Sequence, residues 1–456
     1  MYSDKKLTRR DFLRAAGLTG AAAILSSCAP QAAPPAPAAT QAAQAATPMP
    51  LKGTTIKAYL QDMLYQRYLQ KILPEFEKQT GIKVQMEFVS FAVMLQQAEV
   101  ELSSGSSSYD VMENIFIKAQ RWMRAGWEAP LDDYIAKSKY DTSDFIPALL
   151  SPHSWQGKQY ALPYLSECTQ MIYRKDVLDS AGLKPPDTFD DLEQVLGKIN
   201  KPPAFYGYVM RTQKDGVHFP FPIWLQGYGG NIFRNPPEDL TPTLNSDTAI
   251  KATQNFTDLI LKYSIAGPQI YDTPDCQNAI SQGKAGIWID ALGTFSPLLD
   301  PTKSKFADKM ALALPPAGPA GRFPQIATHG FMIPKSSRNK DAAWQFIAWA
   351  LSGDTMKRAA IEGNFPAVTR KSVLTSPEYA RRYTIAGINT GDLITKALQL
   401  SKCAYRVVPE FPQIGARVGQ AIGEILSKQN SVKAALDAAQ NDAVQIMTAA
   451  GYKISP

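Results

Sequence analysis

Apolar residues near the start of the folded chain follow the periods of strands and helices in turn. Residues 54–60 are rich in β-forming side chains, and residues 65–79 place apolar side chains three and four positions apart, which is helical spacing. Gly81 ends this helix, and residues 82–89 alternate as a strand does. A further helix and the start of a third strand follow within 91–112. This alternation predicts parallel βαβ units.

The same patterns predict elements along the rest of the chain. Strands are expected at 205–210, within 283–290, at 311–314 and at 325–334. Helices are expected at 246–263, 339–351, 414–427 and 432–449.

Three ordered segments carry a resemblance to a known family. Residues 157–192 read GKQYALPYLSECTQMIYRKDVLDSAGLKPPDTFDDL, in which two prolines end one helix and Asp187 or Thr188 can cap the next. Residues 125–134 read AGWEAPLDDY, and residues 339–349 read NKDAAWQFIAW. This order resembles the extracellular solute-binding proteins that serve ABC sugar importers, the maltose-binding-like family.

The resemblance runs from Thr54 to about Tyr452 and implies a fold. It implies an α/β protein of the type II periplasmic-binding class, with two βα lobes joined by a three-crossing hinge and a ligand cleft between them. The first lobe is expected over 53–165 plus 330–366, and the second over 166–329 plus 367–456. A ligand that touches both lobes would stabilise the closed form through its higher affinity for that form.

The N-terminus has the features of an export signal. Residues 8–14 (TRRDFLR) resemble the twin-arginine motif, and the short apolar run at 15–25 falls well below the ~20 residues that span a bilayer. The letters LSSC, ending at Cys28, resemble the lipobox whose cysteine is acylated in bacterial lipoproteins. We expect a signal peptide over 1–27, then a lipidated Cys28 and a disordered Ala/Pro-rich tether over 28–52. A plain secretory signal with a chance cysteine is the alternative.

Charge and composition exclude several classes of function. The net charge is +7, and the residues before Cys28, with five basic and two acidic side chains, supply +3 of it. The remaining +4 forms no basic stripe, so we expect no nucleic-acid partner. No cofactor motif and no C-x-x-C occurs, so neither a cofactor nor a metal is expected. The histidines are isolated: His153, His218 and His329. Besides Cys28, three cysteines allow at most one disulfide, whose pairing is open: Cys168, Cys276 and Cys403.

The resemblance also implies which residues face the cleft. Glu167 stands out from the residues themselves, because a lone carboxylate in an apolar stretch after a proline turn needs a partner. The expected ligand-binding residues are Gln61, Asp62, Glu113, Asn114, Phe116, Glu167, His218, Phe219, Trp224, Asp290, Phe295, His329, Phe365 and Glu410. Ordinary core positions are the alternative for Phe219, Trp224 and Phe365. Many relatives have a Trp where this chain has Gly293-Thr294, which leaves open which ring stacks on the ligand.

Two hypotheses follow from different classes. The first is a monomeric, lipid-anchored binding protein that captures a sugar or polyol outside the cytoplasm and delivers it to ABC permease subunits. Under this first hypothesis the protein is not an enzyme. The second is an exported enzyme, either a hydrolase or a cofactor-dependent oxidoreductase. A glycosidase, for example, could use Glu167 with Asp290 or Glu113 as its acid pair. The missing cofactor motifs favour the first hypothesis.

Export and anchoring should depend on the N-terminal motifs. Changing Arg9 and Arg10 together to lysine should block twin-arginine export, and Cys28→Ala should release the processed protein from the membrane. Cell fractionation of the two variants against the wild type tests both. A processed Cys28→Ala protein that stays in the membrane fraction would contradict the lipoprotein assignment.

Overall fold

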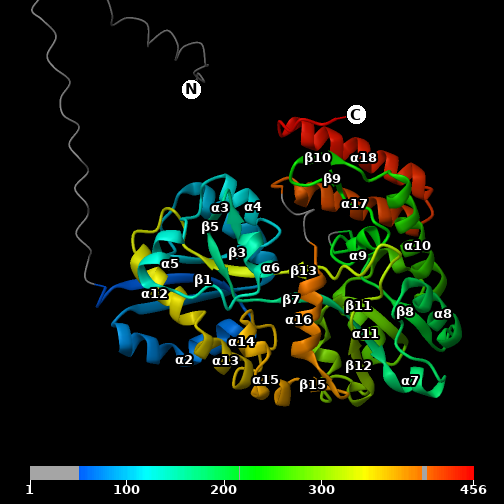
Figure 1. Ribbon diagram of the computed structural model, residues 1–456, viewed down its shortest axis with the longest axis horizontal. Coiled ribbons are helices and arrows are strands. Elements are labelled where there is room, and N and C mark those ends of the chain that lie inside the picture. Colours follow the sequence, from blue (N-terminus) through cyan, green and yellow to red (C-terminus); the bar gives the residue numbers. More distant parts are fainter. Residues whose placement is uncertain (1–50, 215, 403–407, 456) are drawn as a thin grey trace, which may run out of the picture. The chain divides into compact units, whose positions relative to one another are not determined.

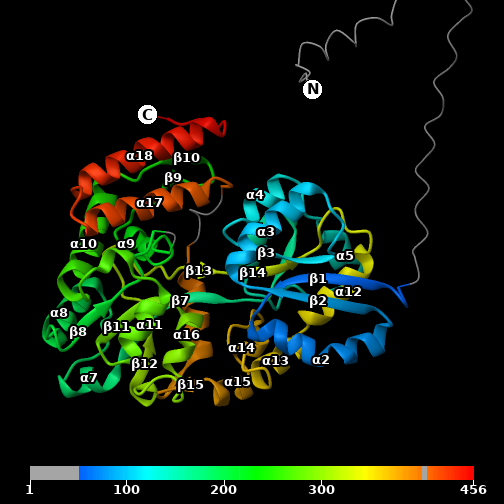
Figure 2. The same cartoon turned by 180° about the vertical axis from the view of Figure 1, so that it is seen from behind.

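Two β-sheets organise the protein in this computed structural model, which describes residues 51–455 except 215 and 403–407. The first sheet has the strand order β2-β1-β3-β14-β6, and the second has the order β12-β7-β11-β8, with β13 also paired to β7. Each sheet and the helices around it form one lobe, and Figures 1 and 2 show the two lobes side by side. The two-lobed α/β fold expected from the sequence is therefore confirmed.

The first sheet is parallel at one edge and antiparallel at the other. Its strands are β1 (Thr55–Gln61), β2 (Lys83–Val89), β3 (Val111–Ile115), β6 (Ala161–Pro163) and β14 (His329–Met332). Strand β1 runs parallel to both β2 and β3, as the βαβ pattern predicts. Strand β14 returns antiparallel to β3 and pairs His329 with Ile115, so the start of β14 lies beside the end of β3.

The second sheet is built around one long strand. Its strands are β7 (Glu167–Arg174), β8 (Tyr206–Val209), β11 (Ala285–Ala291), β12 (Met310–Ala313) and β13 (Ile326–Ala327). Strand β7 is antiparallel to β11, β12 and β13, whereas β11 and β8 are parallel. Ala291 pairs with Thr169, so the start of β7 lies at the edge where β11 ends.

Helices surround the two sheets, and three short hairpins complete the fold. The helices are α2 (Leu64–Thr80), α3 (Phe91–Ser104), α4 (Ala119–Arg124), α5 (Asp132–Ser138), α6 (Pro147–Leu150), α7 (Lys175–Ser180), α8 (Phe189–Ile199), α9 (Phe221–Gly227), α10 (Asp247–Tyr263), α11 (Thr273–Ser281), α12 (Lys340–Ala350), α13 (Gly353–Ile361), α14 (Lys371–Leu374), α15 (Pro377–Arg382), α16 (Thr390–Leu400), α17 (Phe411–Leu426) and α18 (Val432–Ala449). The hairpins pair β4 (Ser154–Trp155) with β5 (Lys158–Gln159), β9 (Phe233–Asn235) with β10 (Asp239–Pro242), and β15 (Thr384–Ile385) with β16 (Ile388–Asn389). A 3₁₀ helix, η3 (Leu292–Leu298), follows β11 directly.

Local sequence signals set several helix ends. Gly81 ends α2 with a φ of 74°, a left-handed conformation that glycine adopts without steric cost. At the start of α8, the Thr188 hydroxyl accepts from the backbone N–H of Asp191, whose carboxylate accepts from the N–H of Thr188. This reciprocal capping box satisfies two donors that the helix leaves free. It selects Thr188 over Asp187 as the cap of α8.

Three segments of the chain cross between the lobes and are bonded to one another. The first crossing joins β6 to β7, and the backbone N–H of Tyr164 donates to the carbonyl of His329 in the second crossing, at 2.9 Å. The N–H of Ser166 donates to the carbonyl of Ala367 in the third crossing at 2.8 Å. The Ser166 hydroxyl donates to the carbonyl of Val368 at 2.6 Å. The hinge is therefore a small hydrogen-bonded unit rather than three separate linkers.

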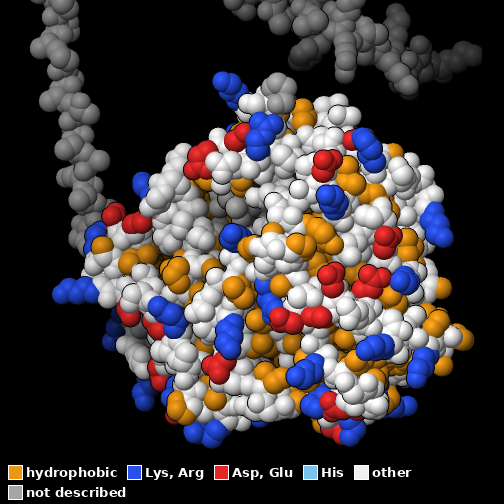
Figure 3. Space-filling model, turned by 45° about the vertical axis from the view of Figure 1, so that its right-hand side comes forward, with side chains coloured by type: hydrophobic (Ala, Val, Ile, Leu, Met, Phe, Trp, Pro, Cys, Tyr) orange, Lys and Arg blue, Asp and Glu red, His pale blue; other side chains and the backbone are white. Residues whose placement is uncertain are grey.

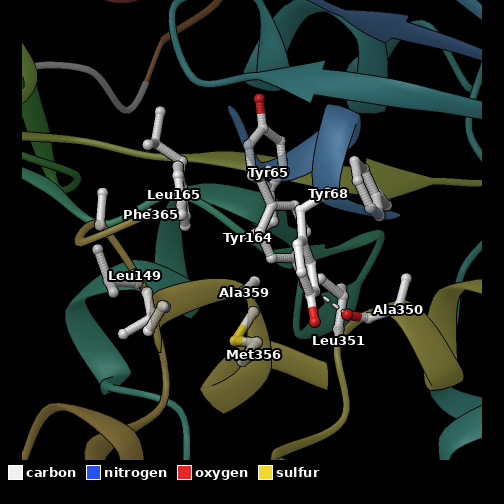
Figure 4. Close-up of a cluster of buried hydrophobic side chains, with 14 of the residues drawn as sticks. Tyr65, Tyr68, Leu149, Tyr164, Leu165, Ala350, Leu351, Met356, Ala359 and Phe365 are labelled. Carbon is white, nitrogen blue, oxygen red and sulfur yellow. Dashed lines mark hydrogen bonds between the residues drawn. The ribbon is translucent and has the colours of Figure 1, made fainter. Parts of the chain in front are cut away.

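An aromatic cluster packs beneath the hinge in the first lobe (Figure 4). The Tyr65 ring lies 5.5 Å from that of Tyr164, stacked on it, and 5.0 Å from that of Phe365. All three side chains are almost fully buried. Because an aromatic ring removes about 150–250 Å² from water, this cluster anchors the first and third crossings to the core.

The short helices α14 and α15 come shortly after residue 367, where the sequence predicts that the chain returns to the second lobe. They contact α13, which packs on α2 and α12 of the first lobe. The sequence-based boundary at residue 367 stays a prediction, and this packing does not support it.

Further expectations concern cysteines and membrane segments. Cys168 and Cys276 are buried free thiols, so they form no disulfide with each other, and Cys403 lies outside the described residues. The signal segment, Cys28 and most of the tether also lie outside them. Among the helices of the described part, none has the length and apolar character to cross a bilayer. Basic and acidic side chains are interspersed over the face in Figure 3, in keeping with the modest net charge.

Candidate functional site

A cavity of about 410 Å³ lies where the strand ends of the two sheets meet. Its walls come from residues at or after the ends of β1, β3, β8 and β11, from α3, from the start of α17, and from residues at the crossings, which are Leu165, Glu167, Ala327 and His329. Ligands of open α/β sheets bind at the carboxyl ends of strands, which is this edge. The lining residues are Gln61, Met63, Phe91, Leu95, Phe116, Ile117, Leu165, Glu167, Arg211, Gly216, His218, Phe219, Ala291, Thr294, Ala327, His329, Phe411, Pro412, Gly415 and Ala416.

Four phenylalanine rings line the cavity, two from each lobe. Phe91 and Phe116 both stack on the His329 ring, at centroid distances of 5.6 and 5.8 Å. On the second lobe, Phe219 lies 5.7 Å from the Arg211 guanidinium, and Phe411 lies edge-on to His218 at 5.8 Å. Because the rings come from both lobes, a flat apolar ligand face can be held from two sides.

Arg211 and Asp290 form a fixed ion pair in the wall of the cavity. The Arg211 Nε and Nη2 donate to the two carboxylate oxygens of Asp290 at 3.1 and 2.7 Å. The Asp290 side chain is fully buried, whereas that of Arg211 keeps 17% of its surface. Burial raises the pKa of Asp290, and the guanidinium opposes that rise. The bidentate geometry holds Arg211 in one orientation and compensates its charge.

Glu167 is the carboxylate that lines the cavity itself. It begins β7, at the edge where β11 ends, and it is only partly buried. Burial raises its pKa; His329, Arg211 and a hydrogen bond from the backbone N–H of Gly293 lower it, and Asp290 raises it further. Among the described residues, no side chain forms an ion pair with Glu167.

Glu113 holds the cavity wall from behind. Its side chain is fully buried and accepts three hydrogen bonds: from the backbone N–H of Gln61 at 2.8 Å, from Gln66 at 2.7 Å and from the Tyr164 hydroxyl at 2.9 Å. The Nδ1 of His329 lies 3.7 Å away. Glu113 thereby fixes the end of β1 and the first crossing to each other.

Comparison with known proteins agrees with this geometry. The family model described as "Bacterial extracellular solute-binding protein" matches residues 62–357. The chain belongs to the bacterial extracellular solute-binding proteins. It is 28% identical over 393 residues to the erythritol/L-threitol-binding protein of Mycolicibacterium smegmatis, which covers 81% of this chain and 82% of the relative. It is 27% identical over 407 residues to the mannitol-binding protein of Pseudomonas aeruginosa, over 86% and 92% of the two chains.

Solved structures show the same relationship. An ABC transporter solute-binding protein from Agrobacterium radiobacter in complex with ribitol superimposes with a TM-score of 0.76 at 25% identity, covering 87% of this chain and all of that one. A solute-binding protein from Agrobacterium vitis with bound D-mannitol gives 0.73 at 27% identity, over 88% and 99% of the two chains. A maltose-bound protein of Thermotoga maritima, at 20% identity, shares the fold with a TM-score of 0.74.

In this solute-binding protein, six of the fourteen expected contact residues line the cavity. They are Gln61, Phe116, Glu167, His218, Phe219 and His329. For Phe219 this favours the cleft over the core alternative. That these six side chains bind the ligand stays a prediction.

Two expected acids lie one layer behind the cavity, and two lie elsewhere. Glu113 and Asp290 are fully buried against the hydrogen-bond donors already described, so they position the wall rather than face a ligand. Asp62 accepts from Arg67 in an exposed ion pair. Glu410 accepts from Arg124 of the first lobe at 3.3 Å, beside the cavity but outside its lining.

The remaining expected residues lie in the core. Trp224 stacks on Phe189 at 5.0 Å, and Phe295 packs edge-on against Trp288 at 5.2 Å. Phe365 belongs to the aromatic cluster beneath the hinge, as described above. Asn114 is buried in a polar network. The sequence position of these four residues, after a strand or in an aromatic run, suggested the cleft. Packing against the neighbouring element instead decides where their side chains lie.

Sequence reasoning missed several lining residues. Arg211 comes two positions after β8, so the rule that sites gather at strand ends could have found it. Phe91 and Leu95 share one face of α3, but its apolar pattern gave no sign that this face borders a cavity rather than the core. Within the described residues, no group of three or more His, Cys, Asp or Glu side chains is arranged to hold a metal ion.

A buried polar network lies behind His329. The Asn114 amide donates to both oxygens of Glu128 at 2.8 and 2.7 Å, and its carbonyl accepts from the Nδ1 of His153 at 2.7 Å. The Nε2 of His153 can then accept from the Thr328 hydroxyl at 3.2 Å. Burial raises the pKa of Glu128 to about 8 and lowers that of His153 to about 3. No cation compensates Glu128 in this network, so its protonated form is favoured.

Glu128→Gln should remove a loss of stability that develops as the pH rises towards 8. The folded-state pKa of Glu128, about 8, lies above its ordinary value. The contribution of this group to the free energy of unfolding is therefore fully present below about pH 4.3 and is lost as the pH rises to 8. His153 has the opposite dependence, which ends near pH 6.5. Between pH 6.5 and 8, the wild type should therefore lose about 2 kcal/mol more unfolding free energy than Glu128→Gln, as measured by urea denaturation.

The exposed Glu238 offers a matched control. Glu238→Gln should keep the pH dependence of the wild type. Equal pH slopes for the wild type and Glu128→Gln would contradict the buried, raised pKa.

Proposed function

We propose that this protein captures a neutral sugar or polyol by closing its two lobes and delivers it to the permease of an ABC importer. The observation that carries the proposal is the cavity, which joins two phenylalanine rings from each lobe to a small set of polar side chains. Sugars and polyols present C–H faces that pack on rings and hydroxyls that need hydrogen-bond partners. The relatives whose names state a polyol as the ligand support the same class.

The charges of the cavity favour a neutral ligand. Arg211 is the cation that could hold a carboxylate or phosphate, but Asp290 already occupies its Nε and Nη2. Glu167 adds a negative charge that would repel an anion. The hydroxyl groups of a sugar or polyol can donate hydrogen bonds to Glu167 and accept them from the N–H groups of Arg211 that Asp290 does not use.

The location that we propose is the outer face of the cell membrane, with a lipid on Cys28 as the anchor. The support is the sequence of the N-terminus together with the family, whose members act outside the cytoplasm. The protein would act as a monomer on the Ala/Pro-rich tether at 28–52, which would let it reach a permease beside it.

The alternative of a glycosidase loses its acid pair. Such an enzyme needs two carboxyl groups that both reach the substrate. Glu167 reaches the cavity, but Asp290 and Glu113 are fully buried and already accept hydrogen bonds from protein donors. The geometry therefore supports binding rather than hydrolysis.

Glu167→Gln should weaken ligand binding while leaving the shape of the cavity unchanged. The loss should be about 1.5–3 kcal/mol, the range for a hydrogen bond to a charged group. Isothermal titration calorimetry with mannitol, ribitol and erythritol at two salt concentrations would measure it. Affinity of the wild type should depend little on salt, because the ligand is uncharged. Tight binding of a sugar acid, or unchanged affinity in Glu167→Gln, would contradict the assignment.

Binding should also bring the lobes together. Small-angle X-ray scattering should show a smaller radius of gyration at saturating ligand than without it, because the ligand contacts both lobes only in the closed form. Glu167→Gln is the control, and it should need a higher ligand concentration than the wild type for the same change in radius. A radius that does not respond to saturating ligand would contradict closure.

A further inference from the structure

The backbone at Gly293 lies directly against the Glu167 carboxylate. Gly293 is the second residue of η3, which follows β11, while Glu167 begins the adjacent strand β7. A Cβ atom built on Gly293 would overlap the Oε1 of Glu167 and lie 3.1 Å from its Cδ. The three heavy atoms nearest to this Cβ position all belong to Glu167. The nearest obstacle to a side chain at Gly293 is therefore one carboxylate group.

The contact is directional. Oε1 is the oxygen that packs on Gly293, whereas Oε2 lies 3.9 Å from the same Cβ position and is turned away from it. A hydrogen bond from the backbone N–H of Gly293 is among the interactions that lower the pKa of this carboxyl group. Oε1 is thus the oxygen that lies against the Gly293 backbone, and Oε2 is the oxygen farther from it.

The glycine is not required by its own backbone conformation. Gly293 is absent from the glycines with positive φ, so alanine can adopt its conformation without strain. What a side chain would disturb at this position is the carboxylate, not the chain path.

We propose that Gly293 is a positioning residue of the binding site: its missing side chain lets Oε1 of Glu167 seat against the backbone, so that Oε2 is presented to the ligand. Any larger residue would push the carboxylate out of this seat. The proposal rests on the proposed function, because it gives Glu167 the role of ligand acceptor.

A double-mutant cycle tests this role. Gly293→Ala should weaken mannitol, ribitol or erythritol binding by about 10- to 100-fold, the range expected when one charge-assisted hydrogen bond is lost. In a Glu167→Ala background the overlapping carboxylate is gone, so adding Gly293→Ala should change the affinity by less than about twofold. The same coupling should appear in the unfolding midpoint of the ligand-free protein.

A matched control is Gly423→Ala on α17, where the added Cβ would meet no atom within 4 Å. Its effect on affinity should be the same small value with and without Glu167. Equal losses from Gly293→Ala in both backgrounds would overturn the proposal, because the effect would then come from the backbone. No loss in either background would overturn it as well, as would coupling in stability without coupling in affinity.

Failure of the proposed function gives a different result. If the wild type binds none of the three polyols and no sugar in a wider thermal-shift panel, the ligand class is wrong. The unfolding midpoints would still decide whether Gly293 seats the carboxylate. Uncoupled midpoints would then overturn the contact itself.

Discussion

The site depends on a buried carboxylate that must be satisfied. Glu113 has no exposed surface and accepts hydrogen bonds from the end of β1, from α2 and from the first crossing. Leaving a charged group in the interior without partners costs several kcal/mol, so these three elements can move apart only at that cost. The lobe wall that carries Gln61 and the hinge residue Tyr164 therefore behave as one body. A cleft that closes needs such a rigid wall to close against.

In the second lobe, the buried carboxylate is satisfied by an ion pair. Asp290 is buried at the end of β11, and Arg211 after β8 covers it while facing the cavity. Because β11 and β8 are parallel neighbours, their ends bring the two side chains together without a long loop. Arg211 is thus a hydrogen-bond donor that is held in one orientation and whose charge is balanced by Asp290. The antiparallel strand β7 starts at this same edge and adds the carboxylate of Glu167. The strand order therefore brings a hydrogen-bond donor and a hydrogen-bond acceptor to one side of the cavity.

The sequence predicted the architecture well because strand and helix periods, caps and the ordered family segments agree along the chain. It predicted the site less well, for a physical reason. A residue that follows a strand is placed at the correct edge, but its side chain can point into the cavity or into the core. Phe116 points into the cavity, whereas Asn114, two residues earlier, joins the network with Glu128. Trp224 lies in an aromatic run, yet α9 packs it between Phe189 and Phe256. Only the packing of one element on another decides between these outcomes.

One ion pair beside the cavity joins the two lobes directly. Arg124 of the first lobe reaches Glu410, just before α17, and the Tyr452 hydroxyl near the end of the chain. Arg124 is 43% exposed, so salt screens its attraction to Glu410, and the pair is worth about 1 kcal/mol or less. An exposed pair of this strength adds little beside the buried contacts of the hinge, so it joins the two lobes without making ligand binding strongly dependent on salt.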